Sequence, residues 1–235
     1  MKTHEILVLD RSGSMASCGA ATIAGFNTLV EQAQQLAASD DADLRVTLVT
    51  FNHEVEVASF AAPIATLRPL TAASYRPTGT TAMLDAVGAV LERIARDVPD
   101  DEETRYLVMI VSDGAENAST RFDYPTIAEM IQQRQGTGRW TFAYLGANQD
   151  LAKIEASLGI PRRNISAFKS DERGAEDGWT SISRYSRAYL GSGASASEAS
   201  FADAAAAGEA GESEMSSWAR RVVAAARKSG GHGKN

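Results

Sequence analysis

The sequence predicts an α/β fold in which a mostly parallel sheet is covered by helices on both faces. Short runs of apolar and β-branched residues alternate with longer segments of helical periodicity, as in chains whose strands are joined by helices. The runs are also almost continuously apolar, which is typical of strands buried on both faces of a parallel sheet. With 235 residues and 44% hydrophobic positions, the chain has the size and composition expected of one globular domain.

Six segments have the composition of strands, because each is rich in β-branched, aromatic or other apolar residues. They are residues 6–9, 44–51, 106–111 and 140–145, with shorter candidates at residues 55–60 and 164–168. Between most of them, apolar residues recur at helical spacing. The clearest helical patterns run from Ile23 to Ala37 and from Leu84 to Val98, and weaker ones cover residues 126–135, 149–158 and 175–190.

The composition changes after Leu190, and we therefore place the folded domain at residues 1–190. Residues 191–217 consist largely of Gly, Ala and Ser with acidic residues among them, which predicts a flexible acidic linker. Residues 218–235 carry basic residues and no acid, so they are predicted to form a basic tail. Helical spacing of Met215, Trp218 and Val222 predicts a short helix that starts near residue 213.

Composition also excludes several kinds of protein. Cys18 is the single cysteine, so neither an internal disulfide framework nor a cysteine-rich zinc site is possible. A formal net charge of −7 argues against the usual basic surface that binds nucleic acid. The first apolar run, residues 6–9, is too short for a signal peptide or a membrane span. We expect a soluble cytoplasmic protein that binds neither nucleic acid nor membrane.

The informative residues follow the strands, because ligands of open parallel sheets bind beyond the carboxyl ends of the strands. Asp10, Ser12 and Ser14 follow the first strand around a glycine, and Asp113 follows the strand at residues 106–111. A third oxygen-rich stretch, residues 77–81, precedes the longest helical pattern. Carboxylates and hydroxyls without thiol or imidazole are ligands for a hard cation such as Mg²⁺ or Mn²⁺. Because serine hydroxyls are neutral, such an ion keeps positive charge for a carboxylate from outside.

These motifs resemble the metal-ion-dependent adhesion site of von Willebrand factor A-like domains, of the stand-alone bacterial or phage type. The family pattern is Asp-x-Ser-x-Ser, then Thr, then Asp, and the stretches "DRSGS", "GTTAMLDA" and "SDG" match it in that order. Position by position, the resemblance assigns the metal ligands Asp10, Ser12, Ser14, Thr81 and Asp113. Thr81 is assigned rather than Thr80 because it directly precedes the helical stretch that begins at Ala82.

The resemblance implies a doubly wound, Rossmann-like fold with one short antiparallel edge strand at residues 55–60. It also implies a Mg²⁺ or Mn²⁺ ion that accepts an Asp or Glu side chain from a partner protein, and a binding module rather than an enzyme. Arg11, Tyr75 and Arg76 are predicted to form a rim around this site that attracts an acidic partner.

Two other functions are compatible with parts of the sequence. A scaffold subunit with an unused metal motif would have the same fold. A Mg²⁺-dependent phosphohydrolase of the haloacid-dehalogenase type also has an Asp after the first strand, but it needs a second Asp two residues later, where this chain has Ser12. The acidic stretch between Glu198 and Glu214 could also supply the outside carboxylate, which would block the chain's own site or join copies of the chain.

Overall fold

A six-stranded sheet with the strand order β3-β2-β1-β4-β5-β6 forms the centre of the molecule. The computed structural model describes residues 2–40, 42–147 and 150–191. The strands are β1 (Lys2–Asp10), β2 (Asp43–Phe51), β3 (Val55–Pro63), β4 (Thr104–Ser112), β5 (Trp140–Ala147) and β6 (Ile165–Phe168). The helices are α1 (Gly19–Asp40), α2 (Met83–Asp97), α3 (Tyr124–Gln135), α4 (Leu151–Leu158) and α5 (Glu172–Gly191).

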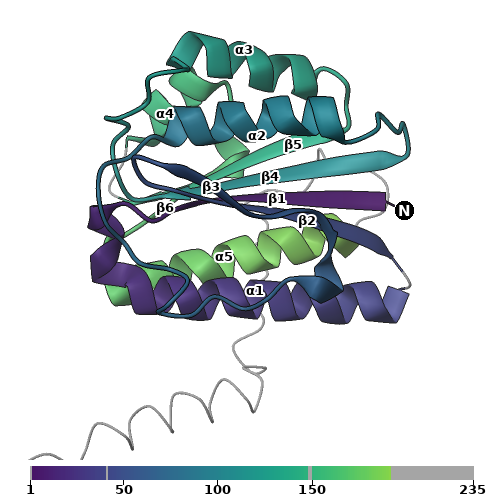
Figure 1. Ribbon diagram of the computed structural model, residues 1–235, viewed down its shortest axis with the longest axis horizontal. Helices are drawn as coiled ribbons and strands as arrows, with labels where there is room; N and C mark the ends of the chain where they lie inside the picture. The colour runs from purple at the N-terminus through teal and green to yellow at the C-terminus, as the bar shows by residue number, and fades with distance from the viewer. Residues whose placement is uncertain (1, 41, 148–149, 192–235) are drawn as a thin grey trace, which may run out of the picture.

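Helices cover both faces of the sheet, as predicted. Figure 1 shows α1 and α5 on one face and α2, α3 and α4 on the other. Within β1, Leu7 and Leu9 pack towards α1 and α5, whereas Ile6 and Val8 pack towards α2 and α3. Successive side chains of a strand point to opposite faces, so a strand covered on both faces must be apolar at nearly every position.

The sheet is parallel except for β3, which pairs antiparallel with β2 at one edge. The predicted fold class is therefore confirmed, including the antiparallel edge strand. This strand is longer than predicted, because it continues to Pro63 through an irregularity in its pairing with β2. Irregular pairing of this kind lets an edge strand bend while it stays attached to its neighbour.

Helices α1, α3 and α5 extend beyond the periodic apolar positions that predicted them, whereas α4 begins two residues later than predicted. For example, α5 begins at Glu172 and α3 begins at Tyr124, because polar capping residues and the first turn carry no apolar pattern. The predicted linker at 191–217, the basic tail at 218–235 and the helix near 213 lie outside the described residues, apart from Gly191. Among the described helices, none is both long and apolar enough to cross a membrane.

Candidate functional site

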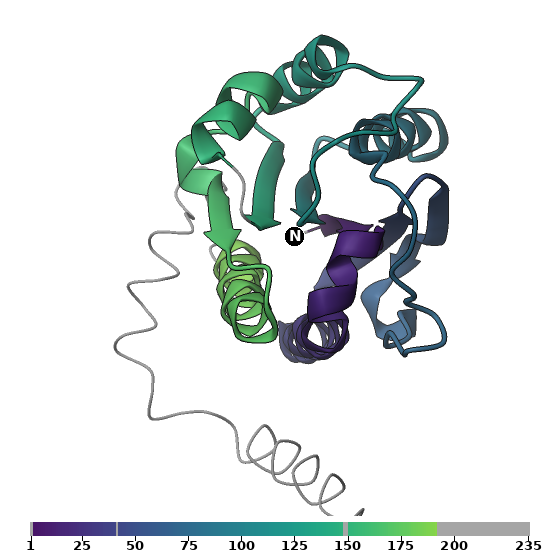
Figure 2. The ribbon, with the colours of Figure 1, turned by 90° about the vertical axis from the view of Figure 1, so that its left-hand side faces the viewer.

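The carboxyl ends of β1 and β4 bring the first and last predicted site residues together. The two strands are parallel neighbours, with Leu9 opposite Val111. Asp10 is the last residue of β1, and Asp113 follows the last residue of β4. Figure 2 looks onto this end of the sheet, where the turn after β1 and the loop after β4 lie on the same side. The topology therefore explains how residues about a hundred positions apart in the sequence form one site.

Asp10 is fully buried, and both of its carboxylate oxygens accept hydrogen bonds. The backbone N–H of Ser12 donates to Oδ1 at 2.6 Å, and the hydroxyl of Ser112 donates to Oδ2 at 2.6 Å. Burial raises the pKa of Asp10, although these hydrogen bonds oppose the rise. The hydroxyl of Tyr75 donates to the backbone carbonyl of Asp10 at 2.6 Å. Groups from two parts of the chain thus fix the direction of the carboxylate, and Tyr75 from a third part holds the backbone of the same residue.

Ser12, Ser14 and Asp113 form a continuous row of oxygens beside Asp10. The hydroxyls of Ser12 and Ser14 lie 3.1 Å apart, and the Ser14 hydroxyl donates to Asp113 Oδ1 at 2.5 Å. The turn that curls the two serines back is held by Gly13, whose N–H donates to the carbonyl of Gly79 at 3.0 Å. Ser12 is buried, whereas Ser14 is exposed. The row therefore runs from the core to the protein surface.

The structure places Thr81, and not Thr80, next to these oxygens. Thr81 is buried and Thr80 is exposed. A Cβ atom built on Gly114 would lie 2.7 Å from Thr81 Oγ1 and 3.3 Å from Ser14 Oγ. The absence of a side chain at Gly114 thus leaves a small space that the Thr81 and Ser14 hydroxyls border. All five predicted ligand residues come together at this one place.

The donor set fits a hard divalent cation. It consists of two carboxylates and three hydroxyls, from Asp10, Asp113, Ser12, Ser14 and Thr81. Within the part of the chain that the structure describes, no three His, Cys, Asp or Glu side chains are grouped so that they could hold a metal ion. At this site, three hydroxyl oxygens lie beside the two carboxylates.

The predicted rim needs a correction at Tyr75. Its side chain is only 2% exposed and lies beneath Asp10, so it cannot meet a partner at the surface. The sequence places it in a polar loop, but its ring fills the core below the site and its hydroxyl holds the end of β1. Arg76 is exposed, and Arg11 is partly exposed with its guanidinium 3.4 Å from the carboxylate of Glu56.

Two serines that support the site were not predicted as site residues. Ser112 orients Asp10, and Ser170 donates its hydroxyl to Asp113 Oδ2 at 3.1 Å. Ser112 adjoins Asp113 in the sequence, so its position in the "SDG" motif could have indicated it. Ser170 lies in the loop between β6 and α5, and no local pattern connects that loop with Asp113.

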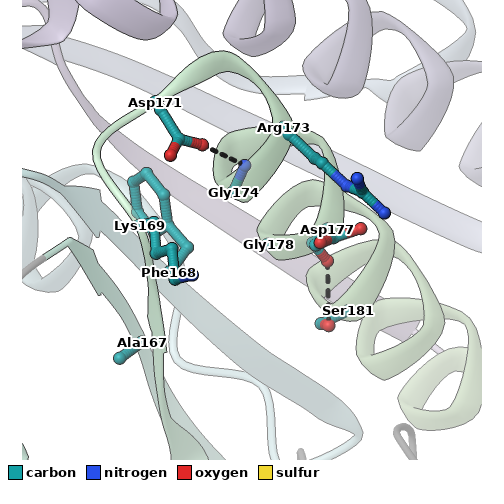
Figure 3. A pocket seen from close by; sticks show the side chains of 9 residues that line it. All are labelled: Ala167, Phe168, Lys169, Asp171, Arg173, Gly174, Asp177, Gly178 and Ser181. Atoms are coloured by element: carbon teal, nitrogen blue, oxygen red, sulfur yellow. Dashed lines mark hydrogen bonds between the residues drawn. The ribbon is translucent and has the colours of Figure 1, made fainter.

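A cleft of about 510 Å³ adjoins the site on the side of α5. It lies between the carboxyl end of β6 and the first turns of α5, with Lys169, Asp171, Arg173 and Asp177 around it, as Figure 3 shows. Ser170, which contacts Asp113, lies between two of these residues in the sequence. The surface next to the site is therefore hollowed and carries charges of both signs.

Comparisons with known proteins identify a family and a shared fold. The family model for the von Willebrand factor type A domain matches residues 6–176. Among curated proteins, none matches this chain. Solved structures share its fold at low sequence identity. One is the von Willebrand factor domain of the type V pili tip protein Mfa5 from Porphyromonas gingivalis, with a TM-score of 0.55 at 13% identity, covering 80% of this chain and 96% of that one.

Two of the similar structures contain metal. Proximal thread matrix protein 1 from the mussel byssus, with a zinc-occupied MIDAS motif, matches at 15% identity and a TM-score of 0.50, covering 76% of this chain and 45% of that one. Manganese-loaded TRAP protein from Plasmodium vivax matches at 17% identity and a TM-score of 0.50, covering 75% of this chain and 71% of that one. The chain spans less than half the length of the first three solved structures that it matches. At these identities the likeness shows a shared fold.

Proposed function

The chain belongs to the von Willebrand factor type A domain family, and from this premise we propose that it is a metal-dependent protein-interaction module. Asp10, Ser12, Ser14, Thr81 and Asp113 would hold a Mg²⁺ or Mn²⁺ ion. The observation that carries the proposal is the continuous row of Ser12, Ser14 and Asp113 oxygens next to Asp10. The hydroxyls of Ser14 and Thr81 also border one small space at Gly114. The metal-containing structures of similar fold support it, since one has zinc at its MIDAS motif and another is loaded with manganese.

The roles of four of the five residues follow from their burial. Asp10 and Ser12 lie at the buried end of the oxygen row and are held in place by the backbone and by Ser112. Ser14 and Asp113 lie at the outer end, where a partner can approach. A bound ion would supply a positively charged position for a carboxylate. We therefore propose a partner protein that presents an Asp or Glu side chain to the outer end of the site.

The alternatives are less well supported by the site residues. A phosphohydrolase of the type considered needs a carboxylate two residues after its nucleophile, and the Ser12 hydroxyl cannot supply one. A scaffold with an unused motif would not need the Ser14 and Thr81 hydroxyls to border the same glycine, or the Ser12 hydroxyl to lie 3.1 Å from that of Ser14. Binding without catalysis is therefore the function that we propose, in the cytoplasm.

The test is a capture experiment with the immobilised full chain. Proteins from the source organism are bound in Mg²⁺ and eluted with EDTA, beside Asp113→Ala and the control Asp150→Ala, which removes a carboxylate that caps α4. We expect the Asp150→Ala variant to capture partner proteins that the Asp113→Ala variant does not capture. Replacement of one Asp or Glu of such a partner by Asn or Gln should abolish its binding. Identical captures in EDTA and by Asp113→Ala would contradict the proposal.

A further inference from the structure

The segment that follows Asp113 lies across the start of α2 and is fastened to it. Eight hydrogen bonds join residues 81–85 to residues 116–122. They run in both directions, because each side supplies backbone N–H donors as well as acceptors. The segment that begins at Thr81 and the segment that follows Asp113 are therefore attached to each other directly, and not only through the sheet.

This segment caps α2 from outside the helix. The residue at the N-cap position is Ala82, whose side chain has no acceptor. Instead, the N–H of Leu84 donates to Glu116 Oε2 at 3.0 Å, and the N–H of Asp85 donates to Ser119 Oγ at 3.0 Å. The first N–H groups of a helix need acceptors that the helix itself does not provide. Because Glu116 and Ser119 provide them, the Thr81 hydroxyl is not needed as a cap and lies beside Gly114.

Asn117 holds the backbone of Thr81 from both sides. Its side-chain Oδ1 accepts from the N–H of Thr81 at 2.9 Å, and its own N–H donates to the carbonyl of Thr81 at 3.0 Å. Asn117 is only four residues beyond Asp113. A short chain with two anchored ends leaves little freedom, so the position of Thr81 is set relative to Asp113.

Residues 120–122, at the far end of the segment, are also hydrogen-bonded to the start of α2. The Asp85 carboxylate accepts from the N–H groups of Thr120, Arg121 and Phe122 at 2.9, 2.9 and 3.0 Å. Phe122 then packs against Gly88 of α2, where a Cβ atom would lie 2.5 Å from its ring. Carboxylates that accept several backbone N–H groups form strong, directional contacts. The segment and the first turns of α2 thus form one unit.

We propose that Asn117 is a positioning residue of the ion site: it fixes the Thr81 hydroxyl beside Asp113, so that these two ligands form one rigid half of the site. The proposal rests on the proposed function, because it concerns the same ion. The other half is the turn with Ser12 and Ser14, which meets this unit through the hydrogen bond from Ser14 to Asp113. Rearrangement of the site would then move the turn against the unit and leave the Thr81 to Asp113 separation unchanged.

The experiment measures Mg²⁺ affinity by calorimetric titration of the full chain with three variants. Asn117→Ala removes the acceptor for the Thr81 N–H, and Asn117→Asp keeps it. Asp123→Ala is the matched control, because it removes the cap of α3 at the Thr126 N–H, at the other end of the same loop. The melting temperature of each metal-free protein is measured in parallel, so that affinity and stability are separated.

We expect Asn117→Ala to weaken Mg²⁺ binding about tenfold, as is usual when a group that orients a metal ligand is lost. Asn117→Asp and Asp123→Ala should stay close to wild type in affinity, even if their melting temperatures fall. Wild-type affinity in Asn117→Ala, or an equal loss in Asp123→Ala, would overturn the proposal and leave the proposed function intact. No Mg²⁺ binding by the wild type would refute the proposed function, and the positioning role with it.

Discussion

The strand β1 carries two fully buried carboxylates, Glu5 near its start and Asp10 at its end, and the structure treats them differently. Asp10 accepts hydrogen bonds on both carboxylate oxygens and lies beside three hydroxyls. Glu5 accepts one, from the Ser186 hydroxyl of α5, and its Oε2 has no hydrogen-bond partner within the described residues. Burial alone therefore does not mark a functional acid. The number of donors that orient its oxygens separates a site from a core position.

The difference also appears in the cost of ionisation. Burial raises the pKa of Glu5 to about 7, and the single hydrogen bond from Ser186 opposes the rise. A cation bound beside Asp10 would compensate the buried negative charge of its carboxylate. Among the described residues, no ion pair compensates the charge of Glu5. We therefore expect substitutions near Asp10 to change the affinity for the ion. Substitution of Glu5 should instead change how the free energy of unfolding depends on pH.

The largest effect on ion binding is expected from Gly114→Ala at the Asp10 end. The added Cβ would lie 2.7 Å from Thr81 Oγ1, so the hydroxyl must rotate out of the site. We expect Mg²⁺ affinity to fall roughly 10- to 100-fold, measured by calorimetric titration. Gly19→Ala is the matched control, because its Cβ would meet Pro77 at an ordinary 3.7 Å. Unchanged affinity in Gly114→Ala would show that Thr81 does not contribute to ion binding.

The next effect concerns Glu5 and the pH dependence of unfolding. In the folded state the pKa of Glu5 is about 7 instead of 4.5, so the folded protein binds more protons between these values. Stability should therefore fall as the pH rises from 4.5 to 7 and stay level above, with a total loss of roughly 3 kcal/mol. Urea unfolding of Glu5→Gln across this range should lack the decline. If wild type and Glu5→Gln have parallel profiles, Glu5 is not the group responsible.

The smallest effect is expected from Tyr75→Phe, which changes a buried contact to the backbone of Asp10. It removes the hydroxyl that donates to the Asp10 carbonyl and leaves the ring in place. Loss of one buried hydrogen bond should cost about 1 kcal/mol in the free energy of unfolding. Denaturant titration checks this, and Mg²⁺ affinity should fall a few-fold. A rim role for Tyr75 would instead leave stability unchanged and alter partner binding.

The fold class could be predicted from the alternation of strands and helices, whereas the five site residues were assigned through the resemblance of three short motifs to the family pattern. Alternating strands and helices determine the parallel sheet, and the ends of adjacent parallel strands must meet. Asp10 and Asp113 could therefore be expected together from the order of the strands. Thr81 was chosen over Thr80 from its place before α2; in the structure the Thr81 hydroxyl borders the space at Gly114, and Thr80 is exposed.

What the sequence did not predict are contacts between distant segments. Ser186 and Glu5 are 181 residues apart, and Ser170 and Asp113 are 57 apart. No periodic pattern specifies such pairs, because they depend on how α5 packs on the sheet. Tyr75 was misplaced for the same reason: a polar loop predicts an exposed ring, but the core below Asp10 has room for it.

The most direct test of the ion site is the thermal stability of EDTA-treated protein with and without excess Mg²⁺ or Mn²⁺, beside Asp10→Ala and Asp113→Ala. At 100 times its dissociation constant, a ligand adds about 2.7 kcal/mol to the free energy of unfolding, which is a shift of roughly 5–11 °C for a domain of this size. We predict this shift for the wild type and its absence in both variants. An equal shift in all three proteins, or none in the wild type at saturating metal, would contradict an ion held by Asp10 and Asp113.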